Sequence, residues 1–169
     1  MVTVVGRDRP GVIAALAGVL VELGCNLSDT QMAVLQGYSS MMVVADAPEP
    51  VDTDTVEAAL AKGLEHLGHA FWVRRLHDSA NGVPAGRRWL VSVHGADRPG
   101  VVFEVARLLA EAGINVVDLQ SRQTSGTSSL TMKVDVPTAV DGNEVAAELD
   151  RLGEELSLSC SMRPMPERP

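Results

Sequence analysis

Residues 2–31, VTVVGRDRPGVIAALAGVLVELGCNLSDTQ, recur 89 positions later as residues 91–120, VSVHGADRPGVVFEVARLLAEAGINVVDLQ. The similarity continues beyond this stretch without a gap, so that residues 2–76 align with residues 91–165. Of these 75 aligned positions, 28 are identical. Self-similarity at a fixed offset indicates a duplicated structural unit. The sequence therefore predicts one small domain that occurs twice.

The segment between the two repeats has the composition of a connection. It contains Asn81-Gly82 and Pro84, which favour turns and irregular backbone. The predicted organisation is a first domain, a linker, a second domain and a short C-terminal tail, at residues 1–76, 77–88, 89–165 and 166–169.

Each repeat begins with the pattern of a strand, a loop and a helix. Val2–Val5 and Leu90–His94 are short runs rich in β-branched residues, which predict a central strand. Asp-Arg-Pro follows in both repeats, and we expect Asp8 and Asp97 to cap a helix whose first turn holds the proline. Apolar residues then recur at helical spacing until a glycine ends the helix.

The rest of each repeat predicts two strands, a second helix and a final strand. The glycine that ends the first helix, the asparagine that opens the next strand and the turn glycine are Gly24, Asn26 and Gly37, and then Gly113, Asn115 and Gly126. A second helix begins near Asp52 or Asp141, and Asp141 is spaced from Glu144 as in a capping box. The order is βαββαβ, so the predicted fold class is α+β, with two tandem ferredoxin-like domains.

Composition narrows the possible functions. The formal net charge of −8 argues against direct binding to nucleic acid, because phosphate backbones are bound by clustered Lys and Arg. The sequence contains no run of 18 or more apolar residues, so no membrane span is expected, and the first residues do not resemble a signal peptide. Cys25 and Cys160 form no motif and are interpreted as apolar core positions. A cytoplasmic location is expected.

The loop between the first strand and the first helix is the candidate binding element. It reads GRDRPG at residues 6–11 and GADRPG at residues 95–100. Such a loop leaves backbone N–H groups free at a helix N-terminus, where the helix dipole favours an anion. The glycine that precedes the helix would let a carboxylate approach the backbone, although a purely structural role of the aspartate and proline explains their presence as well.

The DRPG loop, the Gly-x-Asn turn and the βαββαβ order resemble the ACT domain, a regulatory module that binds amino acids. Two such domains in tandem resemble the glycine cleavage system transcriptional repressor family. The resemblance implies effector binding between paired domains, at the first loop and at the start of the second strand. The residues that it implies, together with a histidine beside the second loop, are Gly6, Asp8, Gly11, Asn26, His94, Gly95, Asp97, Gly100 and Asn115.

The resulting hypothesis is a non-enzymatic regulatory protein that binds and senses a small amino acid such as glycine. It would act on a protein partner such as a transcription factor. A homodimer is expected because each domain has a small core and exposed strand edges. Neither a cofactor nor a metal is expected, because no Cys or carboxylate pattern completes a metal site with His66 and His69.

Two alternatives remain open. One is a small ferredoxin-like enzyme resembling acylphosphatase, in which Arg98 and Asn115 would hold a phosphate, although the loop lacks the glycine and phenylalanine-arginine pattern of that family. The other is a dimerisation module without a ligand.

Overall fold

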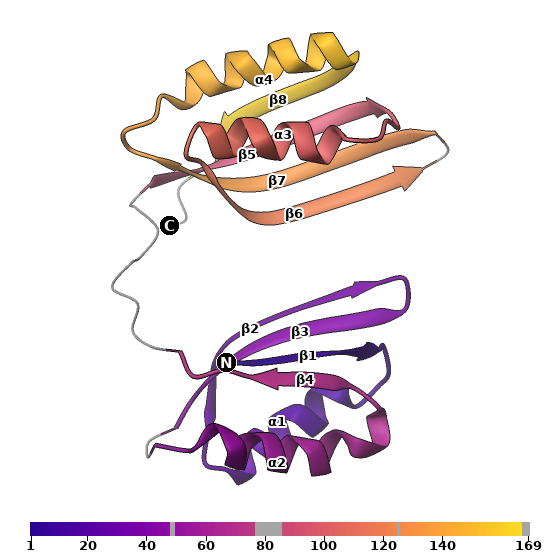
Figure 1. Ribbon diagram of the computed structural model, residues 1–169, viewed down its shortest axis with the longest axis vertical. Helices are drawn as coiled ribbons and strands as arrows, with labels where there is room; N and C mark the ends of the chain where they lie inside the picture. Colours follow the sequence, from indigo (N-terminus) through magenta and orange to yellow (C-terminus); the bar gives the residue numbers. More distant parts are fainter. Residues whose placement is uncertain (48–49, 77–85, 125, 167–169) are drawn as a thin grey trace. The chain divides into compact units, whose positions relative to one another are not determined.

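The computed structural model describes residues 1–47, 50–76, 86–124 and 126–166. The chain divides into two compact units, unit 1 (Met1–Ser79) and unit 2 (Ala80–Pro169). Each unit is a four-stranded antiparallel sheet with two helices on one face (Figure 1). The predicted ferredoxin-like βαββαβ fold is therefore confirmed in both repeats.

Unit 1 has the sheet order β2-β3-β1-β4. Its elements are β1 (Val2–Arg7), α1 (Val12–Glu22), β2 (Asn26–Leu35), β3 (Tyr38–Asp46), α2 (Thr53–Leu64), the short 3-10 turn η1 (Glu65–Leu67) and β4 (Ala70–Val73). The two central strands, β1 and β3, carry buried residues at alternate positions, which is the pattern of strands covered on one face.

Unit 2 has the same order, β6-β7-β5-β8. Its elements are β5 (Gly86–Ala96), α3 (Val101–Glu111), β6 (Asn115–Thr124), β7 (Thr127–Pro137), α4 (Gly142–Leu156) and β8 (Leu158–Pro164). Apolar residues alternate along β7, and Leu130, Met132, Val134 and Val136 are all buried beneath the helices.

Strand β5 begins at Gly86, so residues 86–88 belong to the sheet and not to the predicted linker. They pair with residues 135–137 of β7, and a Cβ atom at Gly86 would collide with the backbone of Val136. The turn-forming composition around Gly86 predicts a connection, but backbone pairing with β7 extends β5 back to this residue. Residues 77–85 lie outside the described residues.

The first helix of each unit starts later than predicted. Gly11 and Gly100 are the N-cap residues of α1 and α3, with φ angles of +95° and +92°. Asp8 and Asp97 are therefore not helix caps, and the prolines precede the helix within a turn. Only glycine adopts this left-handed conformation without strain, which is why the chain can turn from strand into helix here.

The start of the second helix agrees with the sequence. Asp52 and Asp141 are the N-cap residues of α2 and α4. The Asp141 carboxylate accepts a hydrogen bond from the Asn143 N–H at 2.9 Å. This bond reaches the second residue of the helix, whereas the predicted capping box with Glu144 would use the third.

The sheet face away from the helices differs between the units. In unit 1 it carries exposed apolar side chains such as Met42 and Trp72. In unit 2 it carries ion pairs, from Arg88 to Asp135 at 2.6 Å and from Lys133 to Asp118 at 2.7 Å. The two repeats thus share a core but present different surfaces.

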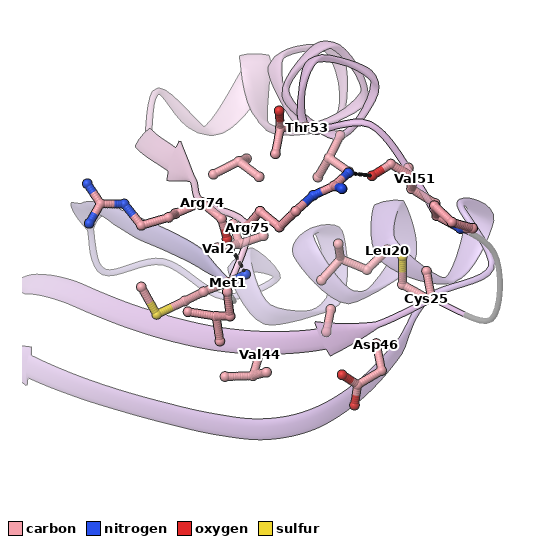
Figure 2. Close-up of a pocket in the computed structure, with 16 residues that line it drawn as sticks. Met1, Val2, Leu20, Cys25, Val44, Asp46, Val51, Thr53, Arg74 and Arg75 are labelled. Atoms are coloured by element: carbon pink, nitrogen blue, oxygen red, sulfur yellow. Dashed lines mark hydrogen bonds between the residues drawn. The ribbon is translucent and has the colours of Figure 1, made fainter. Parts of the chain in front are cut away.

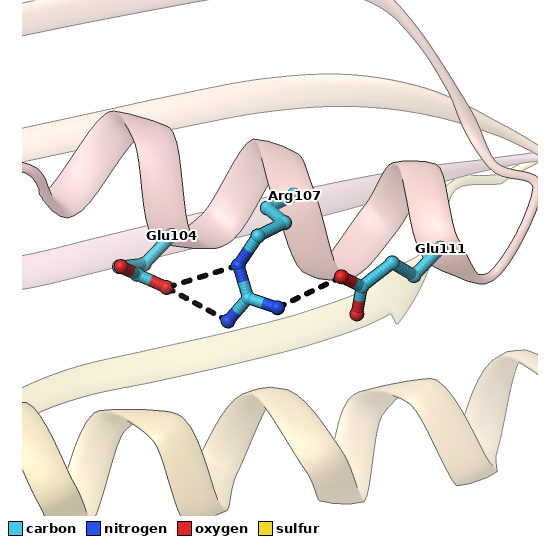
Figure 3. A network of polar contacts seen from close by, with 3 residues as sticks. All are labelled: Glu104, Arg107 and Glu111. Carbon is cyan, nitrogen blue, oxygen red and sulfur yellow. Dashed lines mark hydrogen bonds and ion pairs between the residues drawn. The ribbon is translucent and has the colours of Figure 1, made fainter.

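The outer side of α3 also carries charge. Arg107 donates hydrogen bonds to Glu104 at 2.9 and 3.3 Å and to Glu111 at 2.8 Å, as Figure 3 shows. The bond to Glu104, followed by the bond to Glu111, raises the pKa of the Arg107 guanidinium. The counterparts of Glu104 and Arg107 in α1 are Ala15 and Gly18, so α1 cannot form this network.

Both cysteines are free thiols, Cys25 buried and Cys160 half-buried. Burial, with a smaller contribution from Asp150, raises the pKa of the Cys160 thiol. His69 is buried, and within the described residues its Nε2 atom has no hydrogen-bond partner. No group of three or more His, Cys, Asp or Glu residues in the described ranges is arranged to hold a metal ion.

Trp89 closes one end of the unit 2 core, and its removal should cost much stability. The side chain is 7% exposed, and its ring packs against Gly142. Trp89→Ala should therefore lower the free energy of unfolding of unit 2 by about 3–5 kcal/mol. The matched control is Trp72→Ala, which removes a 59% exposed indole and should cost less than about 1 kcal/mol. Urea unfolding followed by circular dichroism measures both, and equal losses would contradict this account of the core.

Candidate functional site

A pocket of about 490 Å3 lies beside the DRPG loop of unit 2. Its walls come from the loop, from the first turns of α3 and from the helix-facing side of β6 and β7. The residues that line it are Asp97, Arg98, Gly100, Val101, Val102, Phe103, Ala106, Ser121, Gln123, Ser128 and Leu130. Its volume is within the range of roughly 300–1,000 Å3 that is usual for small-molecule sites.

The loop is fixed to the neighbouring hairpin. The Asp97 N–H donates to the Gly126 carbonyl at 3.2 Å, and the Gln123 side-chain amide donates to the Asp97 carboxylate at 2.8 Å. Asp97 is exposed, and its carboxylate accepts this one bond from the described residues, so lone pairs remain for a ligand. The loop thus presents an oriented carboxylate at the pocket.

The start of α3 supplies the opposite polarity. The first helical hydrogen bond runs from the Glu104 N–H to the Gly100 carbonyl at 3.0 Å, which leaves the N–H groups of residues 101–103 without helical partners. Among the described residues, no side chain caps this end. The N–H groups and the helix dipole favour a negative group, and Arg98 adds a full positive charge at the same pocket.

The pocket therefore combines an anion-binding element with a cation-binding element. Asp97 suits an ammonium group, while the helix start and Arg98 suit a carboxylate. Val102 and Phe103 provide an apolar wall, and Ser121 and Gln123 provide a polar one. A free α-amino acid carries all of these features, because it joins both charges to a side chain at one carbon atom.

The corresponding surface of unit 1 has a different lining. At the positions equivalent to Ser121 and Gln123, β2 carries Met32 and Val34. Val34 cannot donate a hydrogen bond to Asp8, and it is 53% exposed. Asp8 keeps the backbone contact, in which its N–H donates to the Gly37 carbonyl at 2.9 Å. The loops are thus alike in backbone and unlike in the side chains that would meet a polar ligand.

Of the residues predicted in the second repeat, Asp97 and Gly100 line the pocket. Gly95 lies in β5, where a Cβ atom would collide with the Leu158 side chain. His94 is exposed and adjacent to buried Val93, so the strand alternation directs it to the sheet face opposite the helices.

Asn115 does not join these residues within unit 2. It pairs with Asp135 at one end of the β6–β7 hairpin, whereas Thr124 pairs with Thr127 at the end beside the loop. The same separation holds in unit 1, where Asn26 pairs with Asp46 while Leu35 pairs with Tyr38. One unit therefore brings the loop and the asparagine to opposite ends of its sheet.

In the first repeat, Gly6 has a packing role, because a Cβ atom there would collide with the ring of His69. Gly11 is different: a Cβ atom would meet nothing within 4 Å, and only its positive φ requires glycine. The same holds for Gly100. At these two positions the backbone conformation requires glycine, and an added side chain would crowd no described protein atom within 4 Å.

Sequence reasoning missed Ser121 and Gln123. A bulge between Val116 and Asp118 shifts the alternation of β6 by one residue. Counting every second residue from Val116 therefore assigns the residues beyond the bulge to the wrong face of the sheet. Alignment of the two repeats could have drawn attention to these positions, because the polar residues of the second repeat align with apolar residues of the first.

Comparison with known proteins gives the family. The sequence profile of the ACT domain matches residues 1–73 and again residues 87–163. The chain therefore belongs to the ACT domain family, and the resemblance of its two DRPG repeats to that family is confirmed. No helix in the described part of the chain is long and apolar enough to cross a membrane.

Among curated relatives, UPF0237 protein SMU_72 of Streptococcus mutans is 36% identical over 74 residues, which are 44% of this chain and 80% of that protein. A UPF0237 protein of Streptococcus pneumoniae is 40% identical over 52 residues, 31% of this chain, and the match spans 59% of its length.

Two solved structures match nearly the whole chain. An unknown protein from Galdieria sulphuraria has a TM-score of 0.84 and 26% identity, with 98% of this chain and 96% of that chain covered. A protein described as a glycine cleavage system transcriptional repressor has a TM-score of 0.70 and 19% identity, with the same coverage. At that identity the second likeness shows the tandem fold alone.

Substitution of Gly100 should separate backbone strain from crowding. Gly100→Val places a β-branched residue at φ +92° and should destabilise unit 2 by about 1–2 kcal/mol. Gly100→Asn should cost distinctly less, because asparagine visits the left-handed region more readily. Thermal melting of both variants tests this, and equal losses would indicate that the side chain meets an obstacle.

Proposed function

We propose that the protein is a non-enzymatic sensor of a small amino acid and that the unit 2 pocket is its effector site. The observation that carries this proposal is the joining of Asp97 and the open start of α3 in one pocket. The zwitterion of an amino acid satisfies both, with its ammonium group at Asp97 and its carboxylate at the helix N–H groups. Membership of the ACT domain family supports the same ligand class.

The pocket suits an amino acid with a small side chain, such as glycine, as well as larger ones. Gln123 restrains the Asp97 carboxylate, so the cation-binding group is positioned before the ligand arrives. Preorganisation of this kind lowers the entropic cost of binding. The unit 1 loop lacks this restraint, because Val34 replaces the glutamine. We therefore place the effector in unit 2 and give the unit 1 loop a structural role.

We further propose that the protein acts in the cytoplasm as a homodimer, and that it signals to a protein partner such as a transcription factor. Both long edge strands, β2 and β6, present unpaired backbone groups, which favours pairing with another chain. The net charge of −8 disfavours a direct role in DNA binding.

The acylphosphatase alternative receives no support from the geometry of unit 2. Arg98 lies at the pocket, whereas Asn115 lies at the far end of β6. A phosphate held by the loop of this unit would therefore lack its second protein ligand. A dimerisation module without a ligand would leave the oriented carboxylate and the open helix start unused.

The effector is identified by thermal shift against the twenty amino acids. A ligand at about one hundred times its dissociation constant stabilises the folded state by roughly 2.7 kcal/mol, which raises the melting temperature of so small a domain by several degrees. Gln123→Val, which installs the residue found in unit 1, should weaken the affinity for the amino acid at least tenfold and so diminish this rise in melting temperature. Gln120→Val on the opposite face of the same strand is the matched control and should leave it unchanged.

Asn115→Ala distinguishes a site within unit 2 from a site shared with a second domain. Because Asn115 is remote from the loop within its own unit, its loss should leave ligand affinity unchanged if the pocket alone binds the effector. A large loss of affinity in a folded Asn115→Ala variant would assign the site to a pair of domains. The readout is the dissociation constant from calorimetry.

The association state and DNA binding are tested with purified protein. Light scattering should give twice the chain mass of 17.9 kDa. A gel shift with duplex DNA at physiological salt should show no specific complex. A monomer in the first experiment or a specific complex in the second would contradict the corresponding part of the proposal.

A further inference from the structure

The open face of the unit 1 sheet, which lies away from α1 and α2, carries large apolar side chains. Strand pairing and alternation place Trp72 of β4, Met42 and Tyr38 of β3 and Leu35 of β2 on this face. These side chains are 59%, 48%, 52% and 73% exposed, respectively. The face therefore presents apolar surface to solvent.

Unit 2 shows that the fold does not require an apolar open face. At the repeat offset of 89, the same positions hold hydroxyl residues, Ser161, Thr131, Thr127 and Thr124. Both units nevertheless form the same sheet and bury the same faces of their strands and helices. Exposed apolar surface beyond what folding needs marks a place where another molecule binds.

Two charged residues stand at the outer strands of this face. Asp29 lies on β2 and Arg74 directly follows β4, and these are the two edge strands of the sheet. Both residues lie at the end of the sheet where β1 begins. In Figure 2, Arg75 reaches the Val51 carbonyl, whereas Arg74 points in the opposite direction. The two edges thus carry opposite charges at the same level of the sheet.

In unit 2 the corresponding aspartate has a partner within its own sheet. Asp118 accepts a hydrogen bond from Lys133 of β7 at 2.7 Å. The counterpart of Lys133 in unit 1 is Val44, which has no charge. Among the described residues, no side chain pairs with that of Asp29 or Arg74. Unit 1 therefore leaves two opposite charges at its edges without internal partners.

We propose that this face binds the same face of a second copy of the chain, about a two-fold axis that runs parallel to the strands between the two sheets. The proposal rests on the homodimer proposed above and names its contact surface. Such an axis lays β2 of one copy over β4 of the other and preserves the level along the strands. Asp29 of each copy then faces the partner's Arg74, so the pair forms twice. Sheets packed face to face lie about 10 Å apart, a distance that an arginine and an aspartate side chain span together.

The centre of the face is complementary to itself in the same arrangement. β1 of one copy lies over β3 of the other, so that Arg7 meets the partner's Tyr38. Within one unit the Arg7 guanidinium lies 5.7 Å from the centre of the Tyr38 ring, and the second ring encloses it from the other side. Met42 pairs with Thr3 inside the sheet and faces the partner's Thr3, so that a large side chain meets a small one.

The area of the face is sufficient for a specific dimer. An aromatic side chain presents about 150–250 Å2 in all, so the exposed parts of the four apolar residues together amount to on the order of 500 Å2. Two such faces bury about 1,000 Å2, which is the total area that a specific interface needs.

The charge of the face also permits self-association. The whole chain carries a formal net charge of −8, which opposes contact between most surfaces of two copies. On this face, however, Arg7 and Arg74 balance Asp29 and Asp46. Figure 2 shows Asp46 on the side of β3 opposite buried Leu20. Two copies therefore meet here without mutual repulsion.

The first test measures the dissociation constant of the dimer by sedimentation equilibrium on the full chain. Trp72→Ser installs the residue found in unit 2 and should weaken the dimer at least tenfold. Val21→Ser, the matched control, removes a 65% exposed apolar side chain from α1 and should leave the constant unchanged. A dimer that Trp72→Ser does not weaken, or that Val21→Ser weakens equally, would place the contact elsewhere.

The failure of this proposal is distinguishable from failure of the proposed function. A wild-type dimer that survives Trp72→Ser refutes the face and retains the homodimer, whereas a wild-type monomer at every concentration refutes both. Trp72 does not line the loop pocket, so Trp72→Ser should leave the amino-acid affinity of unit 2 unchanged. Urea unfolding of Trp72→Ala is measured below the dimer dissociation constant, where the indole is free in the wild type.

The second test exchanges the charges between copies. Asp29→Arg and Arg74→Asp should each weaken the dimer at least several-fold, because each brings like charges together at both edges. An equimolar mixture of the two variant chains should associate as tightly as the wild type, since every arginine then faces an aspartate. A contact within one chain cannot recover on mixing. No loss in either variant, or no recovery in the mixture, would overturn the arrangement.

The third test uses the two tryptophans, of which Trp72 is 59% exposed and Trp89 is 7% exposed. Acrylamide should quench Trp72 fluorescence strongly in dilute protein and several-fold less above the dissociation constant. Trp72→Ser reports Trp89 alone, whose quenching should not change with concentration. A dimer in which Trp72 stays fully accessible would contradict the proposal. A monomer in which Trp72 is shielded would assign the cover to something other than a second copy, and would overturn it as well.

Discussion

The left-handed glycine before the first helix is the constraint on which both units depend. At Gly11 and Gly100 the chain must leave the central strand, cross the end of the sheet and enter a helix within a few residues. A positive φ permits this reversal, and no side chain among the described residues caps the helix start. The same backbone feature therefore sets the position of the first helix over the core and leaves polar N–H groups facing solvent. In unit 2, this helix start lies beside the carboxylate of Asp97.

The two repeats share the packing of the core and differ in the side chains at its two ends. Both units bury the same faces of their central strands and helices. In unit 2 the loop pocket has polar walls, at Ser121 and Gln123, and the opposite end of the core is closed by Trp89. In unit 1 the equivalent loop meets Met32 and Val34, and a pocket lies at the opposite end. The two units thus offer different sites on one backbone.

Much of the fold followed from local sequence pattern. The alternation of apolar residues in β7 and the helical spacing of apolar residues in α2 and α4 are local patterns, and their buried positions form the core of each unit. The predicted aspartate caps at Asp8 and Asp97 were wrong, because the hairpin glycines Gly37 and Gly126 engage the aspartate backbone and the helix begins three residues later. The beginning of β5 was also misjudged, since the pairing that extends it comes from β7, some fifty residues away in sequence.

The sequence by itself determined the duplication, the order of the elements and the loop that we propose as part of the binding site. These depend on residue identity and on short-range periodicity. Only the tertiary structure decided which residues share a site. It separated Asn115 from the loop, because antiparallel pairing sends the two to opposite ends of the sheet, and it turned His94 to the other face. It brought Gln123 to Asp97 through a bulge that changes the facing of β6. Such proximities arise from strand register and from packing across the core, which no local pattern specifies.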